Sequence, residues 1–129
     1  MSFPGGEFII RNRDNQRVLD DKDASPDAGN PIIDYNYKPV DNSNQRWTCR
    51  DNRLVNVHSN LYLTFKSLEP ESKATQEGYR GEGQQFKYNQ GIISLMHDDN
   101  RVVGAWDYDV KIVKPDPHDK ARRWDLVSV

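Results

Sequence analysis

Four side chains between residues 20 and 44 have the chemistry needed to hold a sugar ring. The carboxylate of Asp20 can accept hydrogen bonds from two adjacent hydroxyl groups, and the amide of Asn44 can both donate and accept. The ring of Tyr35 or Tyr37 can cover the apolar face of a hexose. Tyr35 lies nine residues before Asn44, and strand periodicity predicts that Tyr37 shares its face. Asp34 is a further candidate, although its side chain should point the other way and only its backbone is expected to reach a ligand.

Motifs typical of catalysis or of metal binding are absent from the sequence. It has no Gly-rich phosphate loop, no Gly-x-Ser-x-Gly elbow and no His-Glu-x-x-His motif. The histidines at 58, 97 and 118 have no matched spacing, and the single Cys49 excludes an internal disulfide and a cysteine-cluster metal site. We therefore expect no catalytic residues, no metal and no cofactor.

The elements that must position the candidate residues are predicted to be short strands. Apolar residues are only 35% of the 129 residues, and they occur in bursts of strand length bounded by Gly, Asn, Asp or Pro. The turn-forming segments 20–31 and 68–83 are predicted to be loops. Closely spaced short strands indicate an all-β barrel or sandwich, and the chain length indicates one domain over residues 1–129.

An internal repeat narrows this choice. Three units of about 40 residues, roughly 6–50, 51–90 and 91–129, each contain short strands followed by an aromatic anchor. The anchors Trp47, Phe86 and Trp124 are 39 and 38 residues apart, and we expect all three in a shared core. Three such units suggest closure with pseudo-threefold symmetry, which removes free sheet edges.

These features give the chain a resemblance to the ricin-B-type β-trefoil lectins, whose repeats end in a Gln-x-Trp motif. Gln45 with Trp47 matches that motif, Gln84 with Phe86 matches it in part, and Trp124 keeps only its aromatic position. The resemblance covers essentially the whole chain, and its first twelve residues resemble the lectins of mushrooms. It implies a β-trefoil that binds carbohydrate, with Asp20 as the sugar-binding aspartate. It also implies galactose or N-acetylgalactosamine as ligand type and a role in fungal defence.

The second and third repeats lack the full set of sugar-binding groups. Thr64 and Gly104 stand where the first repeat has Asp20, whereas Gly83 and Ala121 stand in place of Asn44. We therefore expect a single site per chain, in the first repeat. A homodimer would be one route to multivalent binding.

Partners other than glycans are not expected. The net charge is −2 without any Lys/Arg block, which argues against nucleic acid, and no apolar stretch is long enough to insert into a membrane. The N-terminal residues do not resemble a signal peptide, so we expect a cytoplasmic location. The alternative is a β-trefoil protease inhibitor that acts through the loop 21–28, where Lys22 would enter a trypsin-type pocket. The flanking Asp21 and Asp23 argue against it, because they bring like charge toward an acidic pocket floor.

Overall fold

The computed structural model describes residues 2–129, so Met1 of the predicted N-terminal segment lies outside the described residues. The all-β prediction is confirmed. The strands are β1 (Phe8–Asn12), β2 (Val18–Asp21), β3 (Ile32–Tyr35), β4 (Trp47–Arg50), β5 (Arg53–Asn56), β6 (Tyr62–Thr64), β7 (Ser72–Lys73), β8 (Thr75–Glu77), β9 (Phe86–Asn89), β10 (Ile92–Leu95), β11 (Asp98–Trp106), β12 (Asp109–Val113) and β13 (Trp124–Ser128). Three single 3₁₀ turns complete the fold: η1 (Lys22–Ala24), η2 (Ser43–Gln45) and η3 (Lys120–Arg122).

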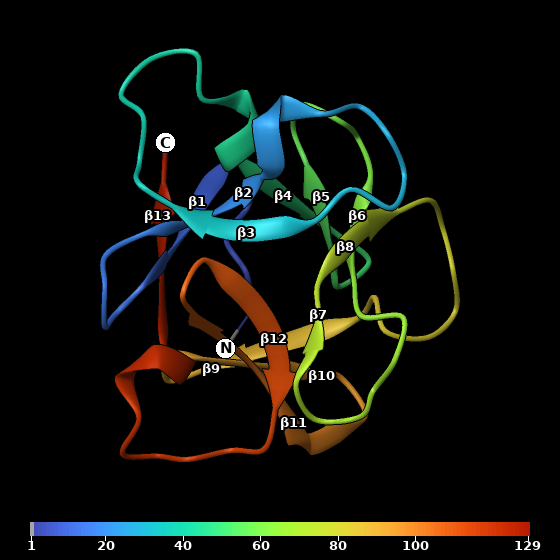
Figure 1. The fold of residues 1–129 in the computed structure, drawn as a ribbon, viewed down its shortest axis with the longest axis vertical. Helices are drawn as coiled ribbons and strands as arrows, with labels where there is room; N and C mark the ends of the chain where they lie inside the picture. The colour runs from blue at the N-terminus through green and yellow to red at the C-terminus, as the bar shows by residue number, and fades with distance from the viewer. Residues whose placement is uncertain (1) are drawn as a thin grey trace.

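All thirteen strands of residues 2–129 belong to one curled sheet (Figure 1). Its strand order is β8-β6-β5-β4-β1-β2-β3-β12-β11-β10-β9, with β13 paired to β1 and β7 paired to β12. The strands β1 and β13 run antiparallel from the pair Phe8 and Ser128 to the pair Asn12 and Trp124. The last repeat is therefore hydrogen-bonded to the first, which closes the chain on itself.

One backbone hydrogen bond recurs three times around the molecule. The residue before each aromatic anchor accepts from the start of the turn in the next unit: Arg46 from Val57, Gln85 from Met96 and Arg123 from Arg13, each at 2.9 Å. The same bond joins the first unit to the second, the second to the third and the third to the first. This closed threefold pattern is that of a β-trefoil.

The aromatic anchors lie at the centre of the core. Trp47, Phe86 and Trp124 are fully buried. The two indole N–H groups donate to Leu19 O and Val103 O, at 3.2 and 2.8 Å respectively, so each tryptophan also fastens the second strand of its own unit. A buried indole needs such a partner, and phenylalanine at 86 needs none.

The predicted loop 68–83 contains the strands β7 and β8, and this part of the prediction was wrong. Both are short and mostly polar, with only Ala74 between them in the core, so they have no alternating apolar pattern to reveal them. They form because their backbones pair with β12 and β6.

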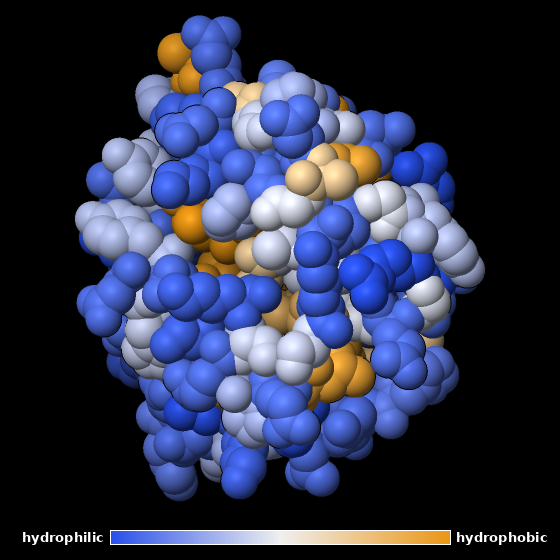
Figure 2. Space-filling model, turned by 45° about the vertical axis from the view of Figure 1, so that its right-hand side comes forward, coloured by the Kyte–Doolittle hydropathy of each residue, from blue (hydrophilic) through white to orange (hydrophobic). Residues whose placement is uncertain are grey.

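The surface of the molecule is largely hydrophilic on the face drawn in Figure 2, where apolar side chains occur in small patches between polar ones. This agrees with the low apolar content of the sequence. Within residues 2–129, no helix is long and apolar enough to cross a membrane.

Candidate functional site

The carboxylate of Asp20 is held in place by two amide side chains. Asp20 is the last but one residue of β2 and pairs with Ile33, and the 3₁₀ turn η2 brings Asn44 and Gln45 to it. Gln45 Nε2 donates to one carboxylate oxygen at 2.8 Å, and Asn44 Nδ2 donates to the other at 3.2 Å. Burial raises the pKa of Asp20, although the bond from Gln45 and the charge of Lys38 oppose the shift. A fixed carboxylate of this kind presents its remaining lone pairs in defined directions.

A pocket of about 200 Å³ opens in front of this carboxylate. Asp20, Asn44 and the 46% exposed Tyr35 all line it. The structure thus brings together a carboxylate, an amide and a ring from three separate segments. The lining residues are Asp20, Lys22, Asp23, Ile33, Tyr35, Lys38 and Asn44.

Two of the predicted site residues lie outside this pocket. Strand β3 ends at Tyr35, so the strand periodicity expected for Tyr37 does not extend to it, and the Tyr37 hydroxyl accepts a bond from Asn42 at 3.1 Å. The side chain of Asp34 points to the other side of the strand, where it is buried and accepts from Asn15 at 2.6 Å. The backbone N–H of Asp34 is also engaged, because it donates to Tyr108 O at 3.2 Å.

Four pocket residues were not predicted as ligand contacts: the apolar Ile33 and the charged Lys22, Asp23 and Lys38. Lys38 Nζ donates to Asn44 Oδ1 at 3.0 Å, which orients that amide so that its NH₂ group faces Asp20. Asp23 reaches the pocket because its φ of +58° bends η1 sharply. Lys22 was considered only as an inhibitor residue. No sequence pattern marks these positions, since irregular backbone determines where their side chains point.

The second repeat has the same glutamine without the charged acceptor. Gln84 Nε2 donates to Thr64 Oγ1 at 3.0 Å and to Gly78 O at 2.7 Å, as Gln45 Nε2 does to Asp20 and Asn36 O. Gly83 offers no side chain, and its φ of +74° is left-handed. A carboxylate and an amide are therefore both missing from this place.

In the third repeat, the side chain of Trp106 occupies the position that corresponds to Asp20. A Cβ atom at Gly104 would lie 2.5 Å from Cη2 of Trp106, so the indole ring occupies the space that an aspartate would need. The guanidinium group of Arg122 lies 5.1 Å from the centroid of the same ring. The missing aspartate is evident from Gly104 in the sequence, whereas the ring that replaces it becomes evident only in the folded chain.

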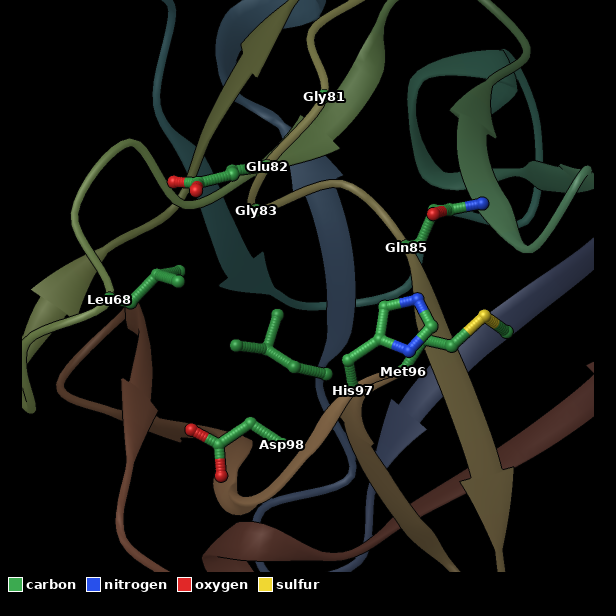
Figure 3. A pocket seen from close by; sticks show the side chains of 9 residues that line it. Leu68, Gly81, Glu82, Gly83, Gln85, Met96, His97 and Asp98 are labelled. Carbon is green, nitrogen blue, oxygen red and sulfur yellow. The ribbon is translucent and has the colours of Figure 1, made fainter.

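A larger pocket of about 320 Å³ lies between the second and third repeats (Figure 3). Leu68 faces His97 across it, and Glu82 and Asp98 lie at opposite sides. No aromatic wall and no amide-bound carboxylate border this pocket, so its chemistry is not that of a hexose site. It is lined by Leu68, Gly81, Glu82, Gly83, Gln85, Leu95, Met96, His97 and Asp98.

Metal coordination is not indicated by the side chains of residues 2–129, where no group of three or more His, Cys, Asp or Glu could hold an ion. His58 lies beside Ser43, with its Nδ1 atom 3.2 Å from the hydroxyl oxygen.

Solved structures similar to this chain share its fold. The mdaA-1 domain has a TM-score of 0.88 at 24% identity, with 99% of this chain and 93% of that chain covered. The designed threefold-symmetric protein ThreeFoil has a TM-score of 0.83 at 21% identity, covering 95% and 99%. The C-half of the earthworm R-type lectin, solved in complex with GalNAc, has a TM-score of 0.81 at 16% identity, covering 98% and 100%.

Sequence comparison identifies the family. No curated protein matches the chain at a significant level. Residues 2–76, more than half of the chain, match the family described as "Ricin-type beta-trefoil lectin domain-like". This stretch includes every residue that lines the pocket at Asp20. The chain therefore belongs to the ricin-type β-trefoil lectin-like family.

Proposed function

We propose that the protein binds glycans through the pocket at Asp20, with galactose or N-acetylgalactosamine as the residue bound there. The observation that carries the proposal is the carboxylate of Asp20, fixed by Asn44 and Gln45 beside the exposed ring of Tyr35. Family membership supports carbohydrate binding, and the similar earthworm lectin was solved with GalNAc.

Each group in the pocket has a distinct role in this proposal. Asp20 accepts bonds from two adjacent hydroxyls, which an axial hydroxyl brings within reach of one carboxylate, while the ring of Tyr35 covers the apolar face of the sugar. Lys38 and Lys22 supply donors at the rim. A shallow site of this size should bind a monosaccharide with a Kd of about 1 mM, near −4 kcal/mol.

We further propose a single site of this type per chain, because Thr64 and Gly83 remove its polar groups in the second repeat and Trp106 fills its place in the third. Useful avidity would then require extended glycans or an assembly of several chains. A defensive role against animals that feed on the producing organism is a proposal that rests on the resemblance to mushroom lectins.

Protease inhibition through the loop 21–28 is not favoured. An inhibitory loop must present an extended segment to the enzyme, whereas this loop begins with the 3₁₀ turn η1. Side chains of Asn30 and Gln76 also bind the backbone carbonyls of this loop. Asn30 Nδ2 donates to Lys22 O, and Gln76 Nε2 donates to the carbonyls of Ser25 and Asp27, each at 2.9 Å. The side chain of Lys22 borders the pocket.

Calorimetric titration with N-acetylgalactosamine tests the proposal, using Tyr35→Ala with Tyr79→Ala as the matched control. Tyr79 is also an exposed tyrosine, 71% exposed, but it lies in the second repeat. Tyr35→Ala should weaken binding about tenfold, because the apolar face of the sugar loses its contact with the tyrosine ring. Tyr79→Ala should leave the Kd unchanged. Equal effects of the two variants, or inhibition of trypsin that is lost in Lys22→Ala, would refute the proposal.

A further inference from the structure

An aromatic side chain from the third repeat lies directly beside the first-repeat pocket. The ring centroids of Tyr35 and Tyr108 are 5.9 Å apart with an angle of 41° between the rings. Both side chains are nearly half exposed, at 46% and 45%. Tyr108 reaches this position because β12, which begins at Asp109, pairs with β3 at Ile33. Tyr35 thus borders the pocket and also belongs to a two-ring surface outside it.

The backbone at Tyr108 is unusual for such a side chain. Asp107 and Tyr108 form the two-residue turn between β11 and β12, with φ of +51° and +71°. A turn with both residues left-handed favours Asn-Gly or Asp-Gly. Two other hairpins have residues that adopt a left-handed φ more readily at the second turn position, Asn52 between β4 and β5 and Gly91 between β9 and β10. A tyrosine at this position is strained, and residues held in strained conformations cluster at ligand-binding sites.

A cation fixes the orientation of the Tyr108 ring. The guanidinium carbon of Arg17 lies 4.0 Å from the centroid of that ring, and its Nη2 donates to the Tyr108 hydroxyl at 3.1 Å. A guanidinium group has five N–H donors, so others remain for a ligand. Arg17, Tyr35 and Tyr108 together form a surface with two π-faces and polar donors, which we term the tyrosine ledge.

We propose that the tyrosine ledge is a second subsite, which binds the next residue of a glycan whose terminal sugar occupies the pocket at Asp20. This inference rests on the proposed function of that pocket. A chain that leaves the pocket past Tyr35 meets Tyr108 next, because the two rings are adjacent. The second sugar stacks on Tyr108, and the remaining donors of Arg17 bind its hydroxyl oxygens. The ligand class is therefore an oligosaccharide of two or more residues.

The test compares methyl β-galactoside with lactose by calorimetric titration of the wild-type protein and of Tyr108→Gly. This variant removes the ring but creates an Asp-Gly turn, so it should fold with a Tm at or above that of the wild type. The matched control is Asn52→Gly, which makes the same change of turn far from the pocket. Wild-type protein and the control should bind lactose about twofold to tenfold more tightly than methyl β-galactoside.

Tyr108→Gly should bind both sugars with the affinity that the wild type has for methyl β-galactoside. Equal wild-type affinity for the two sugars, or a preference for lactose that survives in Tyr108→Gly, would overturn the second subsite and leave the pocket at Asp20 intact. If wild-type protein binds neither sugar, the proposed function of the pocket itself fails, and the second subsite fails with it.

Discussion

The first and second repeats contain the same glutamine but surround it differently. Gln45 and Gln84 each accept a backbone N–H, from Lys38 and Arg80, at 2.9 and 2.7 Å. Each also donates to a side chain near the end of the second strand, which is Asp20 in one repeat and Thr64 in the other. The glutamine therefore fastens a loop in both repeats. Only in the first does this fastening also fix a carboxylate in front of a pocket.

The difference shows that the part of the motif that builds the fold can persist without the part that offers binding groups. A neutral hydroxyl in place of the carboxylate still satisfies the buried glutamine amide, so the second repeat loses little stability. The same replacement removes the charged acceptor that a sugar would need. A Gln-x-aromatic motif is consequently evidence for the fold, whereas the residues that the glutamine contacts decide whether a site exists.

The largest effect is expected at the aromatic anchors, which both repeats share. Trp47→Ala should lower the free energy of unfolding by about 3–5 kcal/mol, because it opens a cavity and leaves Leu19 O without its donor. Phe86→Ala should have an effect in the same range. Urea denaturation followed by fluorescence or circular dichroism measures both. A soluble Trp47→Ala variant of wild-type stability would show that the anchors do not support the core.

The backbone of the second repeat should not accommodate the binding residues of the first repeat. In Gly83→Asn, the new Cβ would lie 2.1 Å from Phe65 O, and φ is already left-handed, so we expect a loss of about 2–4 kcal/mol or a failure to fold. Thermal unfolding measures the loss. The double variant Thr64→Asp, Gly83→Asn should accordingly gain no second sugar site. A stable double variant that binds two sugars per chain in calorimetry would show that the backbone at Gly83 does accommodate an asparagine, against this expectation.

A buried acid next to the pocket should make stability depend on pH. Burial raises the pKa of Asp21 from 3.8 to about 6, and its Oδ2 has no hydrogen-bond partner, whereas the second repeat has the apolar Phe65 in the same position. Because the folded state binds this proton more tightly than the unfolded state, the stabilisation is complete below pH 3.8. It is lost as the pH rises through about 6.

Asp21→Asn should therefore be more stable than the wild type at pH 7, by about 1–3 kcal/mol, with the difference disappearing near pH 4. Urea denaturation of both proteins at several pH values measures this. A difference that stays constant with pH would show that Asp21 does not titrate in this window.

The smallest effect is expected at Lys38, whose charge opposes the rise in the pKa of Asp20. Lys38→Met should weaken sugar binding about twofold to fivefold at pH 7, because Asn44 loses the contact that orients it. Binding needs the ionised carboxylate and is lost as the pH falls, so the variant should lose it at a higher pH than the wild type. Arg80→Met is the control from the second repeat, and a matching effect there would rule out a local role for Lys38.

The fold could be predicted because it depends on spacing. The three anchors and the short apolar segments of strand length recur at regular intervals along the chain. Large aromatic side chains at such intervals indicate a shared core. The proximity of Asp20, Tyr35 and Asn44 was predictable for the same reason, since each follows from its place in the repeat. Their role in binding stays a prediction.

The rest of the site depends on irregular backbone and on neighbouring side chains. The periodicity assumed for Tyr37 does not hold because β3 ends at Tyr35, two residues earlier, where Asn36 and Pro39 are the residue types that disfavour a longer strand. Asp23 enters the pocket through a left-handed φ, and Trp106 fills the third repeat only because Gly104 has no side chain. Tyr108 comes from another repeat through the pairing of β3 with β12. Contacts of these kinds are set by the assembled sheet.

The most direct measurement is a ¹H–¹⁵N NMR titration of the wild-type protein with N-acetylgalactosamine. We expect saturable shifts in the backbone amides of Asp20, Lys22, Lys38 and Asn44, all at one Kd of about 1 mM. The amides of Thr64, Gly83, Gly104 and Ala121 should not move. Saturable shifts centred on the second or third repeat, or none anywhere with either this sugar or galactose, would contradict the assignment of the first repeat as the binding site.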